Sequence, residues 1–194
     1  MPTVGVLALQ GAFREHMAVL LRMGTRAVEI RQREHIDGID ALIIPGGEST
    51  TIGRLLAEWN MLAHLKERIQ AGMPVYGSCA GLILLCKTIE NSDQPSLGVL
   101  DIRVRRNAFG RQTDSFETKL TMPELGRTPF HAVFIRAPVI TEVGPGVRVL
   151  AEFDRMAVAV RRDNVLATSF HPELTQDMRL HRYFMKKMCE TGVN

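Results

Sequence analysis

One stretch of the sequence runs Val75-Tyr76-Gly77-Ser78-Cys79-Ala80-Gly81-Leu82-Ile83-Leu84-Leu85, an apolar strand followed without a linker by an apolar helix. Its centre has the Gly-x-nucleophile-x-Gly form of a nucleophile elbow, with cysteine in the place of serine. So tight a turn forces its central residue into a strained backbone conformation, and Gly77 and Gly81 prevent side-chain collisions. We therefore expect the Cys79 thiol to project from the tip of the turn.

The position of Cys79 suits a reactive thiol. Unpaired N–H groups and the dipole at a helix N-terminus favour the thiolate, and the Ala80 N–H is placed to stabilise an oxyanion during acyl transfer. The alternative is that Cys79 is a small buried residue in a glycine-rich turn before a core helix. A nucleophilic role therefore requires a partner base elsewhere in the chain.

Strand and helix patterns alternate through the first half of the chain. Apolar runs predict strands at 3–9, 26–30, 41–44 and directly before Cys79, and apolar spacing predicts helices at about 12–23, 51–58 and 61–70. The first helix presents Phe13, Met17, Leu20 and Leu21 on one face. The spacing suits βαβ crossovers, so we predict an α/β three-layer sandwich with a mostly parallel central sheet flanked by helices.

The pattern changes at about Leu97 to short strand-like runs. They lie at 99–104, 116–120, 131–135, 147–152, 157–161 and 165–169, and they predict antiparallel additions to the sheet. A helix over 175–188, with Thr175 as N-cap, closes the chain. No repeat or linker interrupts the sequence, so residues 1–194 are predicted to form a single domain.

Three loops are expected at the carboxyl ends of the parallel strands, where ligands bind in such sheets. They are Gln10-Gly11, the loop over 45–51 and the Cys79 elbow. Gly46 and Gly47 let the backbone approach a ligand and offer N–H groups to an anion. The same segment, Pro45-Gly46-Gly47-Glu48-Ser49, is also compatible with a plain tight turn before a helix capped by Ser49.

The candidate base is His171, in Ser169-Phe170-His171-Pro172-Glu173, at the end of the last apolar strand. If that strand runs parallel to the others, His171 lies at the same sheet edge as Cys79. Pro172 favours extended geometry at His171, so Glu173 can reach back to the imidazole. Cys79, His171 and Glu173 then fill the roles of nucleophile, base and orienting group. Alternatively, His171 is a polar residue in an ordinary turn.

The remaining polar candidates give weaker signals. His16, His35, His64, His131 and His181 are interpreted as structural or solvated, and Cys86 as a buried residue on the helix that follows Cys79. Arg106 and Arg136 are either solvated charges or residues that bind a carboxylate, which arginine contacts through two parallel hydrogen bonds.

Composition excludes several classes of function. The net charge is only +3, and the basic residues are scattered, so nucleic acid is not an expected partner. No apolar run approaches the ~20 residues that cross a bilayer, and the first residues resemble a strand rather than a signal peptide. Three cysteines without a metal-binding spacing suggest a reducing cytoplasm and no metal site.

The elbow, together with Phe170-His171-Pro172-Glu173, resembles the class I triad glutamine amidotransferases, which have a flavodoxin-like fold. A longer set of segments resembles the PdxT family, the glutaminase subunits of pyridoxal 5′-phosphate synthase. The set comprises Leu9-Gln10-Gly11, Pro45 to Thr51, Arg106 to Gln112, Asp114 to Glu117, Phe134 to Pro138 and Ser169 to Leu174. The likeness covers nearly the whole chain. Ser78 stands where threonine is common in that family, a mild departure.

The resemblance implies hydrolysis of L-glutamine to glutamate and ammonia. Cys79 would attack the amide, His171 would transfer protons and Glu173 would orient His171. By the same resemblance, the glutamine site comprises Gly47, Glu48, Ser49, Arg106, Ile135 and Arg136. The oxyanion hole would be formed around Gly46, Gly47 and Ala80, with Gln10 helping to order it.

The resemblance also implies a partner. Ammonia would pass to a PdxS-type synthase subunit, a (β/α)8 barrel, in a large hetero-oligomer, and the chain would carry no cofactor of its own. Three alternatives stay open: another glutaminase such as that of histidine biosynthesis, a binding or regulatory module with an inert or redox-sensing Cys79, and a cysteine peptidase or DJ-1-like protein.

Overall fold

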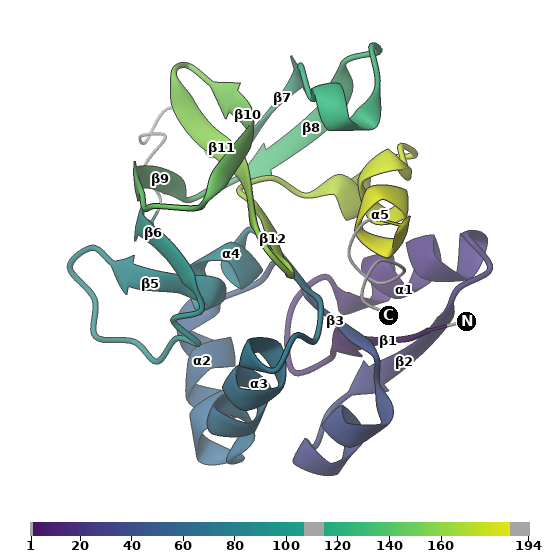
Figure 1. The fold of residues 1–194 in the computed structure, drawn as a ribbon, viewed down its shortest axis with the longest axis vertical. Coiled ribbons are helices and arrows are strands. Elements are labelled where there is room, and N and C mark those ends of the chain that lie inside the picture. The colour runs from purple at the N-terminus through teal and green to yellow at the C-terminus, as the bar shows by residue number, and fades with distance from the viewer. Residues whose placement is uncertain (1, 107–114, 187–194) are drawn as a thin grey trace.

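A seven-stranded sheet forms the centre of the molecule, a computed structural model that describes residues 2–106 and 115–186 (Figure 1). The strand order is β10-β11-β12-β4-β3-β1-β2. Parallel pairing joins β12 (Val165–Thr168), β4 (Val75–Ser78), β3 (Ala41–Ile44), β1 (Thr3–Leu7) and β2 (Arg26–Ile30). Antiparallel pairing adds β11 (Met156–Arg162) and β10 (Arg148–Phe153). The predicted mostly parallel sheet with antiparallel additions is confirmed.

Helices cover both faces of this sheet, as the three-layer prediction requires. Successive strand residues point to opposite faces, so Leu42 and Ile44 of β3 join one hydrophobic cluster while Ala41 and Ile43 join the other. The first cluster includes side chains of α2 (Ser49–Glu58), α3 (Met61–Gln70) and α4 (Ala80–Leu85). The second includes side chains of α1 (Phe13–Arg22) and α5 (Arg179–Phe184).

Two smaller sheets share these hydrophobic clusters. One joins β5 (Cys86–Ile89), β6 (Leu100–Arg105) and β9 (Val139–Val143), and the other pairs β7 (Ser115–Leu120) with β8 (Phe130–Ile135). Ile102 and Ile140 belong to the first cluster, and Phe130 and Phe134 to the second. Short 3-10 helices complete the described elements: η1 (Arg33–Gly38), η2 (Pro123–Leu125) and η3 (Pro172–Leu174).

The last helix differs from its prediction. Thr175 does not cap it: the Thr175 hydroxyl donates to the Pro172 carbonyl and accepts the Asp177 N–H, so it organises a turn. The helix α5 consequently begins only at Arg179. The predicted end at Met188 lies outside the described residues.

Three further expectations are corrected. Cys86 is buried as predicted, but it is the first residue of β5 and not part of the preceding helix. Leu21 does not belong to the buried face of α1, because 64% of it is exposed. Strand β9 was not predicted.

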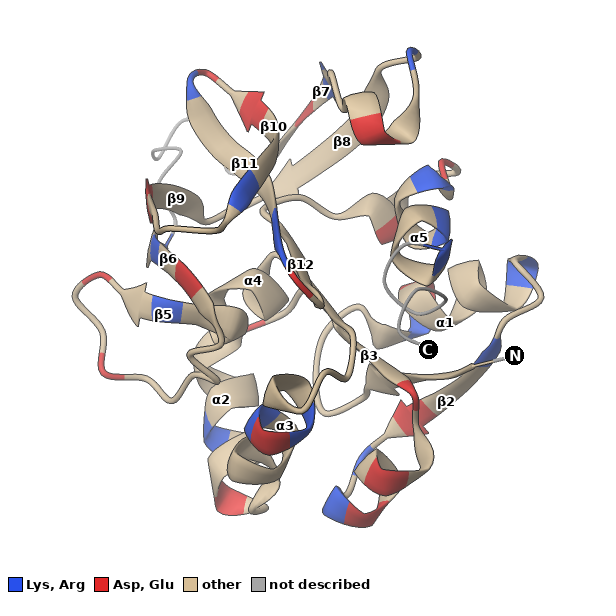
Figure 2. Cartoon of the chain, viewed as in Figure 1, with Lys and Arg blue, Asp and Glu red and all other residues tan. Residues whose placement is uncertain are grey.

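Charged residues of both signs are interspersed over the helices and strands of the described chain (Figure 2). Within residues 2–106 and 115–186, no helix has the length and apolar character needed to cross a membrane.

Candidate active site

Cys79 connects β4 to α4 in the strained geometry that the elbow motif predicts. Its φ is +49° and its ψ is −100°, outside the regions that L-residues normally adopt. A Cβ atom at Gly77 would lie 2.5 Å from the Gly81 carbonyl carbon, and one at Gly81 would lie 2.2 Å from the Ile44 oxygen. Glycine at both positions therefore allows the helix to start directly against the neighbouring strands.

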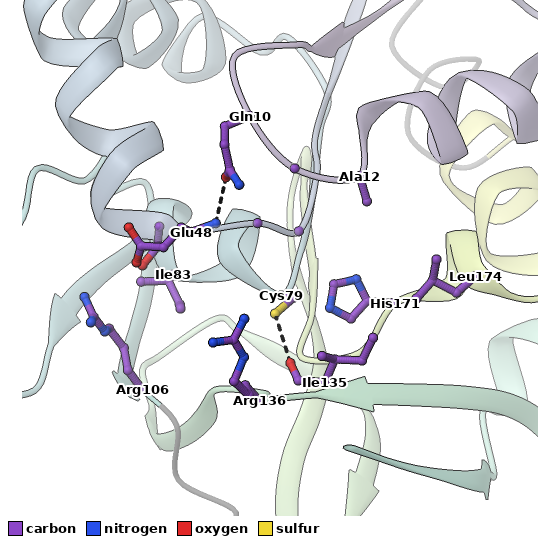
Figure 3. Close-up of a pocket in the computed structure, with 14 residues that line it drawn as sticks. Gln10, Ala12, Glu48, Cys79, Ile83, Arg106, Ile135, Arg136, His171 and Leu174 are labelled. Carbon is purple, nitrogen blue, oxygen red and sulfur yellow. Dashed lines mark hydrogen bonds between the residues drawn. The ribbon is translucent and has the colours of Figure 1, made fainter. Parts of the chain in front are cut away.

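Strand pairing brings His171 to the same sheet edge as Cys79. Strand β12 runs parallel to β4 with Thr168 opposite Ser78, and the Cys79 N–H donates to the Thr168 carbonyl at 2.8 Å. The His171 N–H donates to the Val133 carbonyl, which fixes the segment after β12 against β8. Cys79 and His171 thus lie side by side on the wall of one cavity (Figure 3).

His171 is oriented by Glu173. The imidazole Nδ1 lies 2.7 Å from the Glu173 Oε1, and both residues are buried. Burial lowers the pKa of His171, but hydrogen bonds to Cys79 and Glu173 and the charges of both groups outweigh it and raise this pKa to about 10. Burial raises the pKa of Glu173, but the charge of His16 and the contact with His171 hold it below its usual value. This arrangement favours the imidazolium form of His171.

The cavity beside Cys79 measures about 350 Å³. Most of the residues predicted for the glutamine site and oxyanion hole line it, namely Gln10, Gly46, Gly47, Glu48, Ser49, Arg106, Ile135 and Arg136. Glu173 is not among the lining residues and contacts His171 from behind. Ala80 is buried as the first residue of α4 and does not line the cavity.

The loop after β3 is held by backbone and side-chain contacts. Gly46 N–H donates to the Ser78 hydroxyl at 3.1 Å, and Glu48 N–H donates to the Gln10 side-chain oxygen at 2.8 Å. The Glu48 carboxylate caps α2 by accepting the N–H groups of Thr50 and Thr51. Glu48, rather than the Ser49 considered from sequence, is therefore the N-cap of α2.

Arginine and carbonyl groups form the opposite wall. Arg106 donates from one guanidinium nitrogen to the Thr50 hydroxyl at 2.8 Å and to the Gln94 side-chain oxygen at 2.5 Å. Arg136 is exposed with φ +42°, and the preceding carbonyl of Ile135 lies 3.9 Å from the Cys79 sulfur. Residues 107–114 of the family-specific segments, and Cys189, lie outside the described residues.

Sequence reasoning missed the polar residues that support this site from behind. His16 and His181 are completely buried, and His16 reaches both Ser78 and Glu173. Gln94 accepts hydrogen bonds from Ser49, Thr50 and Arg106. The only sequence signal for His16 is its place on the inward face of an amphipathic helix, which does not indicate what it contacts.

In the part of the chain that the structure describes, no group of three or more His, Cys, Asp or Glu residues is arranged to hold a metal ion. The two described cysteines, Cys79 and Cys86, are free thiols.

The family model described as the SNO glutamine amidotransferase family matches residues 6–190. The pyridoxal 5′-phosphate synthase subunit PdxT of Carboxydothermus hydrogenoformans is 58% identical over 187 residues, covering 96% of this chain and 98% of the relative. The PdxT subunit of Pelotomaculum thermopropionicum is 56% identical, covering 98% of this chain and 97% of that relative.

Solved structures agree with these sequence matches. A crystal structure of a glutamine amidotransferase superposes with a TM-score of 0.90 at 54% identity, covering 94% of this chain and 97% of the other. PurLQS from Thermotoga maritima superposes with a TM-score of 0.73 at 14% identity, covering 96% and 98% of the two chains. The second match is evidence for the fold alone.

Proposed function

The chain belongs to the SNO glutamine amidotransferase family, and from this premise we propose that it is the glutaminase subunit of pyridoxal 5′-phosphate synthase. The substrate is L-glutamine and the products are glutamate and ammonia. One observation carries the chemistry: Cys79 on its strained turn shares a cavity with His171, whose other ring nitrogen lies 2.7 Å from Glu173.

Acylation would start from the charge-paired form of Cys79 and His171. The sulfur attacks the side-chain amide carbon of glutamine, and the carbonyl oxygen becomes an oxyanion. His171 donates its Nε2 proton to the amide nitrogen and the C–N bond breaks. Ammonia departs, and Cys79 carries the glutamyl group as a thioester. Glu173 holds the imidazole in the orientation that both transfers need.

Deacylation reverses these roles. Neutral His171 takes a proton from water while the water oxygen attacks the thioester carbon. The C–S bond then breaks, glutamate leaves, and the sulfur and the imidazolium are restored as a pair. Each cycle consumes one water molecule and one glutamine.

The walls of the cavity suit recognition of an amino acid. Arg106 and Arg136 supply positive charge for the α-carboxylate, and Glu48 supplies a carboxylate near the α2 N-terminus. We assign substrate binding to Gly47, Glu48, Ser49, Arg106, Ile135 and Arg136. N–H groups around Gly46, Gly47 and Ala80 would receive the oxyanion, with Gln10 ordering the loop through its bond to Glu48.

The ammonia would pass to the synthase subunit, for which we propose a PdxS-type (β/α)8 barrel in a large hetero-oligomer in the cytoplasm. In the isolated chain the Gly46 N–H donates to the Ser78 hydroxyl, so it is not free to receive an oxyanion. This supports an oxyanion hole that is incomplete without the partner. A subunit inactive on its own would not waste glutamine.

The decisive experiment measures glutamate release from L-glutamine by the chain alone and with a synthase subunit added, with Cys79→Ala as control. We expect release only in the complex and none from the variant. Release without the partner would retain the triad but contradict the gating and point to another glutaminase. No release in either condition would contradict the proposed activity and favour a binding module.

A further inference from the structure

A buried pair of histidines lies directly behind the triad carboxylate. His16 of α1 and His181 of α5 are both completely buried, although they are far apart in the sequence. The His16 Nδ1 lies 2.9 Å from the His181 Nε2. On the other side of the ring, the His16 Nε2 lies 3.0 Å from the Ser78 hydroxyl and 3.4 Å from the Glu173 Oε2.

His181, His16 and Glu173 form a hydrogen-bonded series of side chains, and a buried atom at each end of the series determines where its protons lie. The Glu173 Oε2 and the His181 Nδ1 have no hydrogen-bond partner other than this 3.4 Å approach of His16 to Glu173. A proton on the His181 Nδ1 would be a buried donor without an acceptor, and it would turn a bare His16 nitrogen toward the carboxylate. Both are costly.

The opposite tautomers satisfy these groups. The His181 Nε2–H then donates to the His16 Nδ1, and the His16 Nε2–H faces Ser78 and the Glu173 Oε2. Only a bare nitrogen of His181 stays unpaired. Burial lowers the pKa of His16, and burial together with His16 lowers the pKa of His181 to about 3, so each ring carries a single N–H at neutral pH.

The charged and titratable groups that face His16 come from several elements. Glu173 and His171 approach it from the segment after β12, His181 from α5, Tyr76 from β4, and Glu15 from its own helix.

We propose that His16 is a positioning residue of the triad, whose Nε2–H holds the second oxygen of Glu173 so that the first oxygen faces His171. His181 fixes the tautomer of His16. The same His16 nitrogen contacts the Ser78 hydroxyl, which in turn accepts the Gly46 N–H. His16 therefore contacts both the Glu173 carboxylate and the hydroxyl that holds the loop after β3. The inference rests on the proposed function, since it concerns how Glu173 orients a working His171.

The test compares variants in the complex with the synthase subunit. His16→Met removes the donor at similar volume, and His16→Gln retains a side-chain N–H that can replace it. Leu20→Ala is the matched control, because Leu20 lies one turn further along α1 and is equally buried. We measure kcat and KM for glutamate release, the pH profile of Cys79 alkylation by iodoacetamide, and the urea midpoint.

We expect His16→Met to lower kcat about 10-fold to 100-fold, by analogy with the loss of a residue that orients a metal ligand, with little change in KM. The acid limb of Cys79 alkylation should move to higher pH, because a less well held Glu173 supports the imidazolium less. His16→Gln should recover most of both properties. Leu20→Ala should lower only the urea midpoint.

Wild-type kcat and alkylation profile in His16→Met, or an equal loss of kcat in Leu20→Ala, would overturn the proposal. Should His16→Met not fold, His181→Met tests the same series of hydrogen bonds and should lower kcat by a smaller factor. A wild-type kcat in His181→Met would count against the proposal. If the wild-type complex hydrolyses no glutamine, the proposed function fails, whereas the alkylation profiles of the isolated variants still decide the role of His16.

Discussion

Gly46 shows how closely the loop after β3 approaches the triad. A Cβ atom at this position would lie 2.2 Å from the His171 Cε1 and 2.8 Å from its Nδ1, well inside van der Waals contact. Any side chain here must displace either the imidazole or the loop. The need for glycine at this position therefore comes from the imidazole, in addition to the backbone access that the sequence suggests.

We expect Gly46→Ala to lower kcat about 100-fold, because displacing a catalytic group by about 1 Å has effects of that size. Gly38→Ala is the control, since a Cβ there has no atom within 4 Å. Steady-state glutamate release by the complex, with circular dichroism to confirm folding, provides the measurement. Unchanged kcat in a folded Gly46→Ala variant would show that the loop yields without disturbing His171.

His181 gives the protein a defined sensitivity to acid. Burial and the neighbouring His16 lower its pKa from 6.5 to about 3 in the folded state. Between these two values, the unfolded chain binds a proton that the folded protein does not, so stability falls as the pH falls from 6.5 toward 3. His171 has the opposite sign: its folded pKa of about 10 adds stability below pH 6.5 that is lost toward pH 10.

We expect His181→Met to flatten the dependence of unfolding free energy on pH between 6.5 and 5. The slope should decrease by up to one proton, or about 1.4 kcal/mol per pH unit. Urea denaturation at several pH values measures this slope, and the range above pH 5 avoids most of the protonation of carboxylates. A variant with the wild-type slope would mean that His181 is already protonated in the folded protein.

At the scale of elements, Arg106 links the end of β6 to the first turn of α2. It donates to Thr50 and Gln94, whereas the side chain of the neighbouring Arg105 is exposed and pairs with Glu90. The two adjacent arginines therefore have different environments. Only Arg106 lines the cavity beside Cys79.

We expect Arg106→Ala to raise KM for glutamine about tenfold or more with a smaller effect on kcat, since charged hydrogen bonds are worth roughly 1.5–3 kcal/mol. Arg105→Ala should leave both constants near the wild-type values. Initial rates over a range of glutamine concentrations distinguish the two. Equal KM in the two variants would remove Arg106 from the substrate site.

The elements that were predicted from sequence are those with a strong local signal. Buried parallel strands such as β3 and β4 are continuous apolar runs, and the elbow is marked by its glycines. By contrast, β5 follows α4 without any turn residue between Leu85 and Cys86, so no local signal marks the change. Strand β9 follows Pro138 with only a short apolar start, and α5 has six residues.

The residues of the candidate site likewise fall into those with a local sequence motif and those without one. Cys79, His171 and Glu173 each carry a local motif, and the sequence places them at one sheet edge. His16 and His181 meet only through the packing of α1 and α5 on the same sheet face, and Gln94 lies in a loop without a pattern. Such contacts between distant segments leave no periodic signature in one sequence.

At the scale of the whole molecule, the small sheets do not have cores of their own. Ile102 and Val104 of β6 pack in the same cluster as Leu42 and Val75 of the large sheet. Phe130 and Phe134 of β8 likewise pack with residues of the large sheet in the second cluster. Shared cores of this kind favour cooperative unfolding, and the prediction of a single domain over residues 1–194 can be tested on that basis.

Two probes provide the test, one at the end of helix α2 and one on a small sheet. Trp59, the single tryptophan, lies half-exposed at the end of α2 beside the large sheet. Cys86 begins β5 of a small sheet, and burial raises the pKa of its thiol to about 12, which makes it unreactive in the folded state. In a chain with Cys79→Ala and Cys189→Ala, we expect Trp59 fluorescence and Cys86 labelling to change at one urea midpoint. Labelling of Cys86 at lower urea than the fluorescence change would mean that the small sheets separate first, because their contribution to the shared core is then too weak to couple them to the large sheet.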